Sequence, residues 1–300
     1  MNNFWWNIGG GIKHSKQLID FNNYLKQYYD VPYNFFNSVY DSIFGMLWNG
    51  GRICQPQDAI TLEEWIELIY NYNFSNIGFN FSFSNRLLQP EHLDDKYCNL
   101  MLSAANEKKG KMNGVILASE ILAEHVRENY PNLKIIYSVC NGLNKVEDYN
   151  QKCEKYDIVV LHPDFNHNLD FLSQLIYKDK IEIMVNDICS FGCPYRAKHY
   201  DWLSQCALVQ AHNPIIHNLS ELDKHRVGGC EAIQNGYQKD NRNKLSFYDL
   251  DILSSMGFSK FKLIGREHEW EDFKKTDLIP YLDQYRIRKI IQDNNLHRHI

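Results

Sequence analysis

Short apolar runs alternate with amphipathic stretches through most of this chain, and this alternation constrains the fold more than any other feature. Each apolar run has the length and composition of a buried strand, and the stretch after it has helical spacing. Strands separated by helices pair in parallel, because each helix carries the chain back to the starting edge of the sheet. The expected strands lie near 33–39 and at 76–83, 114–119, 133–139, 157–164, 181–187 and 259–266.

The clearest helix signal is "TLEEWIELIYNYN" at 61–73. Thr61 is followed three residues later by Glu64, which is the pattern of a capping box. Trp65, Leu68 and Ile69 then form an apolar stripe at helical spacing. Further helices are expected at 120–130, 145–156, 168–178 and 247–258, with a C-terminal helix at 270–300.

Seven or eight strands alternating with helices favour a TIM-barrel-like (β/α) fold over an open dinucleotide-binding sheet. No glycine-rich fingerprint follows the first expected strand, and no Walker-type phosphate loop is present. The glycine-rich segment 7–16 is expected to be a flexible N-terminal turn. The chain is therefore interpreted as one barrel-like, somewhat irregular α/β domain over 1–300, with an N-terminal extension at 1–30.

The chain has 300 residues, eight cysteines and a formal net charge of −5. This charge gives no reason to expect nucleic acid as a partner. No apolar run reaches membrane-spanning length, and the N-terminus lacks the pattern of a signal peptide. A cytoplasmic protein is therefore expected. Its cysteines would be reduced, and close pairs would bind metal or take part in chemistry.

Polar side chains follow several of the expected strands, where parallel barrels place their chemistry. His162 and Asp164 follow the apolar run "DIVVL" (157–161) and are candidates for acid–base catalysis, although hydrogen bonds that tie the loop down are the slightly favoured role. Arg266, which follows the apolar run "FKLI" (261–264), and Arg52 could bind a carboxylate or phosphate, or form structural ion pairs. His162, Asp164 and Arg266 are the predicted catalytic residues.

Two cysteines, Cys189 and Cys193, stand in the loop "NDICSFGCPYRAKHY" (186–200), just beyond a buried strand. Thiolates bind zinc or iron–sulfur clusters, and either centre needs four ligands. The C-x3-C spacing does not choose between the metals, and unrelated buried thiols explain it about equally well. Further candidate ligands are Cys206, Cys230 and Cys54. Cys98 and Cys153 fall in helical patterns and are expected to be packing residues, while Cys140 is ambiguous.

Several segments in this order resemble the collagenase-like peptidase family, the peptidase U32-like proteins. They are "MLWNGGRI", "DIVVLHPDFNHNLDFL", "IMVNDICSFGCPYRAKHYDWLS" and "SKFKLIGRE". The resemblance covers roughly residues 33–290. Relatives in this family carry out oxygen-independent hydroxylation in ubiquinone synthesis and on RNA.

The resemblance implies a barrel that carries a 4Fe-4S cluster at the cysteine loop. Cys189 and Cys193 match the loop pair, and Cys230 matches a later ligand. Cys206 is the first choice for the fourth ligand, and Cys54 is the second. Zinc is the alternative metal.

The expected function is iron–sulfur-dependent modification of a small molecule, by oxygen-independent hydroxylation or related chemistry. The chain lacks the extra domain of the larger RNA-modifying relatives, which favours a small-molecule substrate. A protein partner could act as electron donor. The alternatives are a peptidase, although no H-E-x-x-H or G-x-S-x-G motif occurs, and a non-catalytic scaffold stabilised by metal.

Overall fold

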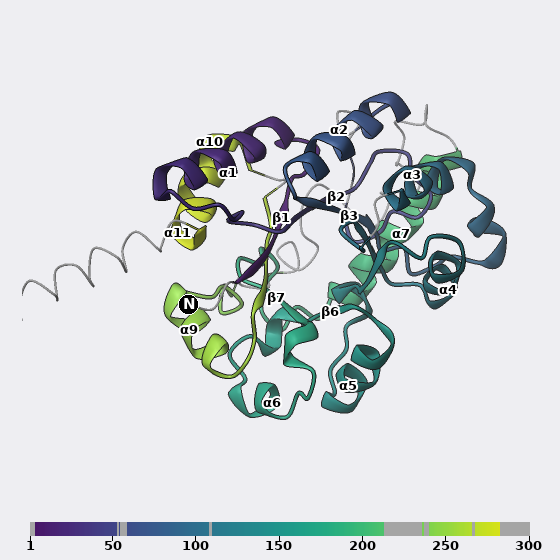
Figure 1. The fold of residues 1–300 in the computed structure, drawn as a ribbon. Coiled ribbons are helices and arrows are strands. Elements are labelled where there is room, and N and C mark those ends of the chain that lie inside the picture. Colours follow the sequence, from purple (N-terminus) through teal and green to yellow (C-terminus); the bar gives the residue numbers. More distant parts are fainter. Residues whose placement is uncertain are drawn as a thin grey trace, which may run out of the picture.

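The computed structural model describes residues 4–52, 54, 59–107, 110–212, 236, 240–265 and 268–282. Eight parallel strands close into a barrel in their order along the chain (Figure 1). The barrel closes because β1 pairs with β8, with Ile8 opposite Leu263. The predicted TIM-barrel-like fold is confirmed. The strands are β1 (Trp5–Gly9), β2 (Ser38–Asp41), β3 (Gly78–Phe83), β4 (Gly114–Leu117), β5 (Lys134–Tyr137), β6 (Ile158–Val160), β7 (Ile181–Met184) and β8 (Lys260–Leu263).

Helices follow the strands and surround the barrel (Figure 1). The capping box of α2 is confirmed: Thr61 Oγ1 accepts from the Glu64 amide at 3.2 Å, and Glu64 Oε2 accepts from the Thr61 amide at 2.8 Å. The helices are α1 (Ser15–Tyr29), α2 (Leu62–Phe74), α3 (Lys96–Asn106), α4 (Glu120–Asn129), α5 (Val146–Lys155), α6 (Leu169–Ser173), α7 (Arg196–His212), α9 (Phe247–Ser255), α10 (Trp270–Phe273) and α11 (Ile279–Leu282), with a π-helical turn (Lys274–Leu278) between the last two.

The N-terminal segment is part of the barrel, so the expectation of a flexible turn and an extension at 1–30 is wrong. Residues Trp5–Gly9 form β1, and α1 follows it. The glycines serve close packing: a Cβ on Gly9 would stand 3.0 Å from the Gly265 amide nitrogen and 3.0 Å from the Tyr40 ring. β1 therefore reaches its neighbours only because its last residue has no side chain.

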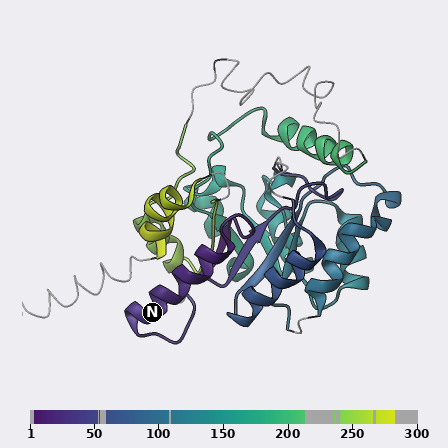
Figure 2. The same ribbon diagram turned by 90° about the horizontal axis from the view of Figure 1, so that it is seen from above.

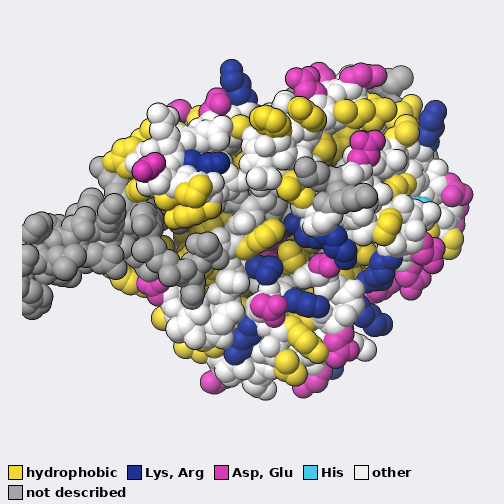
Figure 3. All heavy atoms as spheres, in the orientation of Figure 1, with side chains coloured by type: hydrophobic (Ala, Val, Ile, Leu, Met, Phe, Trp, Pro, Cys, Tyr) yellow, Lys and Arg dark blue, Asp and Glu magenta, His cyan; other side chains and the backbone are white. Residues whose placement is uncertain are grey.

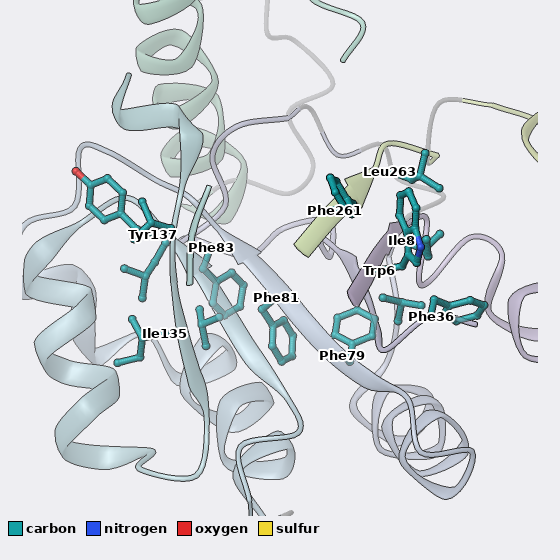
Figure 4. Close-up of a cluster of buried hydrophobic side chains, with 14 of the residues drawn as sticks. Trp6, Ile8, Phe36, Phe79, Phe81, Phe83, Ile135, Tyr137, Phe261 and Leu263 are labelled. Atoms are coloured by element: carbon teal, nitrogen blue, oxygen red, sulfur yellow. The ribbon is translucent and has the colours of Figure 1, made fainter. Parts of the chain in front are cut away.

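The main core lies between the strands and the helices. Phe79, Phe81 and Phe83 point to the same side of β3, toward the helices (Figure 4). Trp65 of α2 packs on Phe81 with ring centroids 4.3 Å apart. The prediction that Cys98 and Cys153 are packing residues is confirmed, since both are fully buried in this core.

The barrel interior contains buried charges as well as apolar side chains. Glu182 of β7 is fully buried; its Oε1 accepts from Asn7 Nδ2 at 3.1 Å, and its Oε2 lies 3.5 Å from Lys262 Nζ. Lys134 is also buried, with its ammonium 4.9 Å from the centroid of the Trp5 ring. These charges lie inside the ring of strands, below the mouth where the carboxyl ends of the strands meet.

Helix α7 lies above one end of the barrel strands (Figure 2). Ser204 fastens it to the loop after β3, because its carbonyl accepts from Asn85 Nδ2 at 3.2 Å and its hydroxyl accepts from the Arg86 amide at 3.1 Å. Figure 3 shows the face of the molecule that is seen in Figure 1. On this face, exposed hydrophobic side chains lie on α2, and basic and acidic side chains lie side by side near the centre. Among the described residues, no helix combines the length and apolar character needed to cross a membrane.

Candidate functional site

The carboxyl ends of the strands surround a hollow of about 80 Å³ that opens to solvent. We call it the mouth cavity. Parallel barrels carry their binding and catalytic groups at this end. Residues in or directly after β2 to β8 line it, namely Tyr40, Ser82, Ile116, Ser138, Val160, Met184 and Lys262. Tyr200 of α7 also lines the cavity, so α7 forms part of its wall.

The predicted cysteine loop follows β7 at the edge of this cavity. Cys189 and Cys193 are half-buried, and the two thiols lie close enough together for Cys193 to affect the pKa of Cys189. Burial raises the pKa of Cys189 to about 12, and Asp187 and Cys193 add to this rise, while the charge of Arg196 opposes it. Without a bound cation, therefore, the Cys189 thiol is protonated at neutral pH.

Arg196, at the start of α7, holds the cysteine loop in place. Its guanidinium lies 3.1 Å from Asp187 Oδ2 and 3.3 Å from Asp164 Oδ1, and it donates to the Ser190 carbonyl at 2.9 Å. The Arg196 side chain is 6% exposed and that of Asp187 is 7% exposed. Burial alone would lower the pKa of Arg196, but Asp187 and its other neighbours outweigh burial and raise it. A buried cation therefore joins both ends of the loop.

The structure brings two of the predicted catalytic residues to this loop. Asp164 Oδ2 accepts from the Gly192 amide at 3.1 Å, so the carboxylate fastens the loop as well as pairing with Arg196. His162 lies 3.7 Å from Asp164, and burial together with the charge of Arg196 lowers its pKa. These contacts give both residues a structural role beside the cysteines. The third predicted catalytic residue, Arg266, lies outside the described residues.

Two asparagines at the strand ends also serve the loop backbone. Asn166 Nδ2 donates to the Met184 and Asn243 carbonyls at 2.9 and 2.8 Å. Asn186 Nδ2 donates to the Ile264 carbonyl at 2.9 Å and to Asp277 at 2.8 Å. They join β7 to the segments that follow it, and thereby fix where the cysteine loop starts.

The described residues provide a pair of thiols and not a complete metal site. No group of three or more His, Cys, Asp or Glu side chains placed to hold a metal occurs in the described part of the chain. Cys193 lies at the start of α7, because its carbonyl accepts a hydrogen bond from the Arg196 amide. Cys206 is buried ten residues further along this helix than Arg196, which is a distance of about 15 Å along the helix axis. Cys230 lies outside the described residues, and Cys54 is buried beside Asn49.

Two soft thiols in one loop suit a transition-metal centre or cluster, and a bound metal ion would supply the positive charge that the thiolates need, since Arg196 alone does not offset the burial of Cys189. The fit therefore holds for Cys189 and Cys193, and any further ligands would have to come from elsewhere in the chain.

Sequence reasoning missed the charged residues of the barrel interior. Lys262 lines the mouth cavity, and Glu182 lies directly behind it. A usable signal exists in the sequence, since each charge stands between two apolar residues of a buried strand, in "IEI" and "FKL". Alternation along a barrel strand places such residues inside the barrel.

A comparison with solved structures finds a similar fold in a protein described as the U32 peptidase Mk0906. The TM-score is 0.56 at 13% sequence identity, and the match covers 87% of this chain and 92% of that one. At this identity the similarity concerns the fold. No protein-family model and no curated protein sequence matches the chain.

Proposed function

We propose that this protein is an iron–sulfur enzyme of the collagenase-like peptidase superfamily that modifies a small molecule, by oxygen-independent hydroxylation or related chemistry. The observation that carries the proposal is the placement of Cys189 and Cys193 close together in one loop at the mouth of the barrel, a loop that the buried Arg196 ties down. The barrel shared with the U32 peptidase structure supports the superfamily. The cavity beside the loop, which opens to solvent, would be the place where the substrate meets the loop.

Four cysteines would hold the 4Fe-4S cluster. Three of them are Cys189, Cys193 and Cys230, and the fourth is either Cys206, the first choice, or Cys54. The cluster would supply one-electron chemistry at the mouth. The chain's own contribution is to fix the cysteine loop through Arg196 and to keep the substrate beside it. Such an enzyme would work in the reducing cytoplasm with a separate electron donor.

Protein purified without oxygen is expected to be brown and to contain iron and acid-labile sulfide in equal amounts. Cys189→Ala and Cys193→Ala are expected to lose most of both, because each removes a thiolate that the cluster needs. Iron and sulfide analysis and the visible absorption spectrum measure this. Cys206→Ala and Cys54→Ala identify the fourth ligand, since only the true ligand affects the iron content.

Cys153→Ala is the matched control, because this thiol is buried in the core and is expected to leave the iron content unchanged. A colourless, iron-free wild-type protein would refute the cluster, and stoichiometric zinc in its place would favour the alternative metal. Equal iron loss in all the variants, the control included, would show that the effect comes from folding.

Peptidase activity is the second candidate, and the description of the structural neighbour favours it. It predicts cleavage of denatured collagen by the purified protein. Cleavage that survives removal of iron and is abolished by Asp164→Asn would replace the proposal above with this one.

A further inference from the structure

The floor of the mouth cavity contains a buried ammonium group. Lys262 is 5% exposed and lines the cavity from β8. Its Nζ lies 3.9 Å from the centroid of the Tyr40 ring, which fixes the side chain by a cation–π contact. Tyr40 is itself fixed, because its hydroxyl donates to the Leu263 carbonyl at 3.1 Å. The cation is therefore held in a defined position at the end of the cavity.

The cavity wall adds positive charge and hydrogen-bonding groups to this floor. Arg52 lines the cavity and lies close enough to Lys262 for its charge to lower the pKa of that ammonium. Asp187 is the one acidic side chain among the described residues of the lining, and Arg196 pairs with it at 3.1 Å. Four serines also line the cavity: Ser42, Ser82, Ser84 and Ser138. The hydroxyls of Ser42 and Ser84 donate to the Ser82 and Ile116 carbonyls, so these two do not donate to a ligand in this arrangement. Hydroxyls and cations arranged in this way bind anions.

Other parts of the lining are apolar. Ile116, Val160, Met184 and Ile264 belong to one buried cluster and also face the cavity. A free inorganic ion would leave these side chains in contact with water, whereas an organic anion would cover them.

Glu182 stands behind Lys262 and favours its charged form. Burial lowers the pKa of Lys262, and Glu182 raises it again from 3.5 Å. The carboxylate is buried inside the barrel and is not among the residues that line the cavity. Glu182 thus acts as a positioning residue, which supports the ammonium without closing its open side.

We infer that the mouth cavity binds a small organic anion, with its carboxylate or phosphate group at Lys262 and Arg52 and its apolar part against Ile116 and Val160. This inference rests on the proposed function for the role of the anion, which would be the substrate presented to the cysteine loop. The binding itself depends only on the barrel and not on the metal.

The test is titration of anaerobically purified protein, with its iron content recorded, by calorimetry at low ionic strength. The probes are benzoate, inorganic phosphate and the neutral analogue benzyl alcohol. Benzoate is expected to saturate one site and to bind more tightly than benzyl alcohol. Lys262→Met and Arg52→Gln are each expected to weaken binding of the anions by about tenfold or more, because each removes one charged donor. Benzoate is also expected to bind more tightly than inorganic phosphate, because only benzoate has an apolar part that covers Ile116 and Val160. Tighter binding of phosphate would overturn the apolar part of the inference.

Lys260→Met is the matched control, since Lys260 lies on the same strand but its ammonium contacts the Asp179 carbonyl, away from the cavity. Absence of saturable binding of both anions, equal binding of benzyl alcohol, or equal weakening by Lys260→Met would overturn the inference. Iron-free protein that still binds benzoate would refute the proposed function and leave this inference standing. Iron-loaded protein that binds neither anion would refute this inference and leave the proposed function standing.

Discussion

Replacing Glu182 by glutamine is expected to lower the free energy of unfolding by about 3 kcal/mol near pH 7, because it leaves buried cations without their carboxylate. Glu182 is fully buried and lies 3.5 Å from Lys262. It also raises the pKa of Lys134 and Lys260, so one carboxylate supports three lysines. Urea unfolding of the variant and the wild type measures the difference.

The cost of this substitution is expected to fall as the pH rises. Burial already lowers the folded-state pKa of Lys134 from 10.5 to about 8, and that of Lys262 in the same direction. Without Glu182, the folded-state pKa of each of these two lysines falls further. At any pH between the folded-state pKa and 10.5, the unfolded chain therefore binds more protons than the folded chain. Stability then increases with pH over this window, and more steeply in the variant. The difference in the free energy of unfolding between Glu182→Gln and the wild type should therefore become smaller between pH 7 and pH 9.5.

Glu120→Gln provides the control. Glu120 pairs with Lys152 on the surface, and its side chain is 49% exposed. Its loss is expected to cost less than about 1 kcal/mol, since exposed pairs contribute little. A similar loss in both variants, or a cost of Glu182→Gln that grows with pH, would contradict the account of the barrel interior.

The barrel could be predicted from the sequence because buried strands and amphipathic helices leave different periodic patterns. β3 and α2 show this most clearly, with the phenylalanines of β3 and the capping box of α2 in the expected places. β1 escaped prediction because it carries the polar Asn7 on its inner face and runs directly into glycines. Those glycines indicate close approach to β8 only after the barrel is known to close.

Only those parts of the candidate site that directly follow a strand could be predicted from the sequence. The cysteine loop could be placed at the mouth from the sequence alone, because it follows the strand at 181–187. The link from Arg196 to Asp164 and Asp187 spans three segments, and no local pattern encodes such a link. Lys262 was missed for a related reason, since its significance depends on β7 and β8 lying side by side.

Replacing Arg196 by methionine is expected to loosen the cysteine loop selectively. The substitution keeps most of the buried side-chain volume but leaves Asp187, 7% exposed, and Asp164 without their shared cation. A broken buried pair costs about 3 kcal/mol, which corresponds to about 100-fold more frequent opening of the loop. Hydrogen–deuterium exchange at the Cys189 and Gly192 amides measures this, because they donate to Asp187 at 3.3 Å and to Asp164 at 3.1 Å.

Lys111→Met is the matched control, since it removes a cation from an exposed pair with Asp157 far from the loop in the chain. It should leave exchange at Cys189 and Gly192 unchanged. Unchanged exchange in Arg196→Met as well would mean that other bonds hold the loop, such as the one from Asn243 Nδ2 to the Cys189 carbonyl at 3.1 Å. Faster exchange limited to the loop would instead identify Arg196 as the residue that holds the cysteine loop closed, because the rest of the barrel does not depend on this cation.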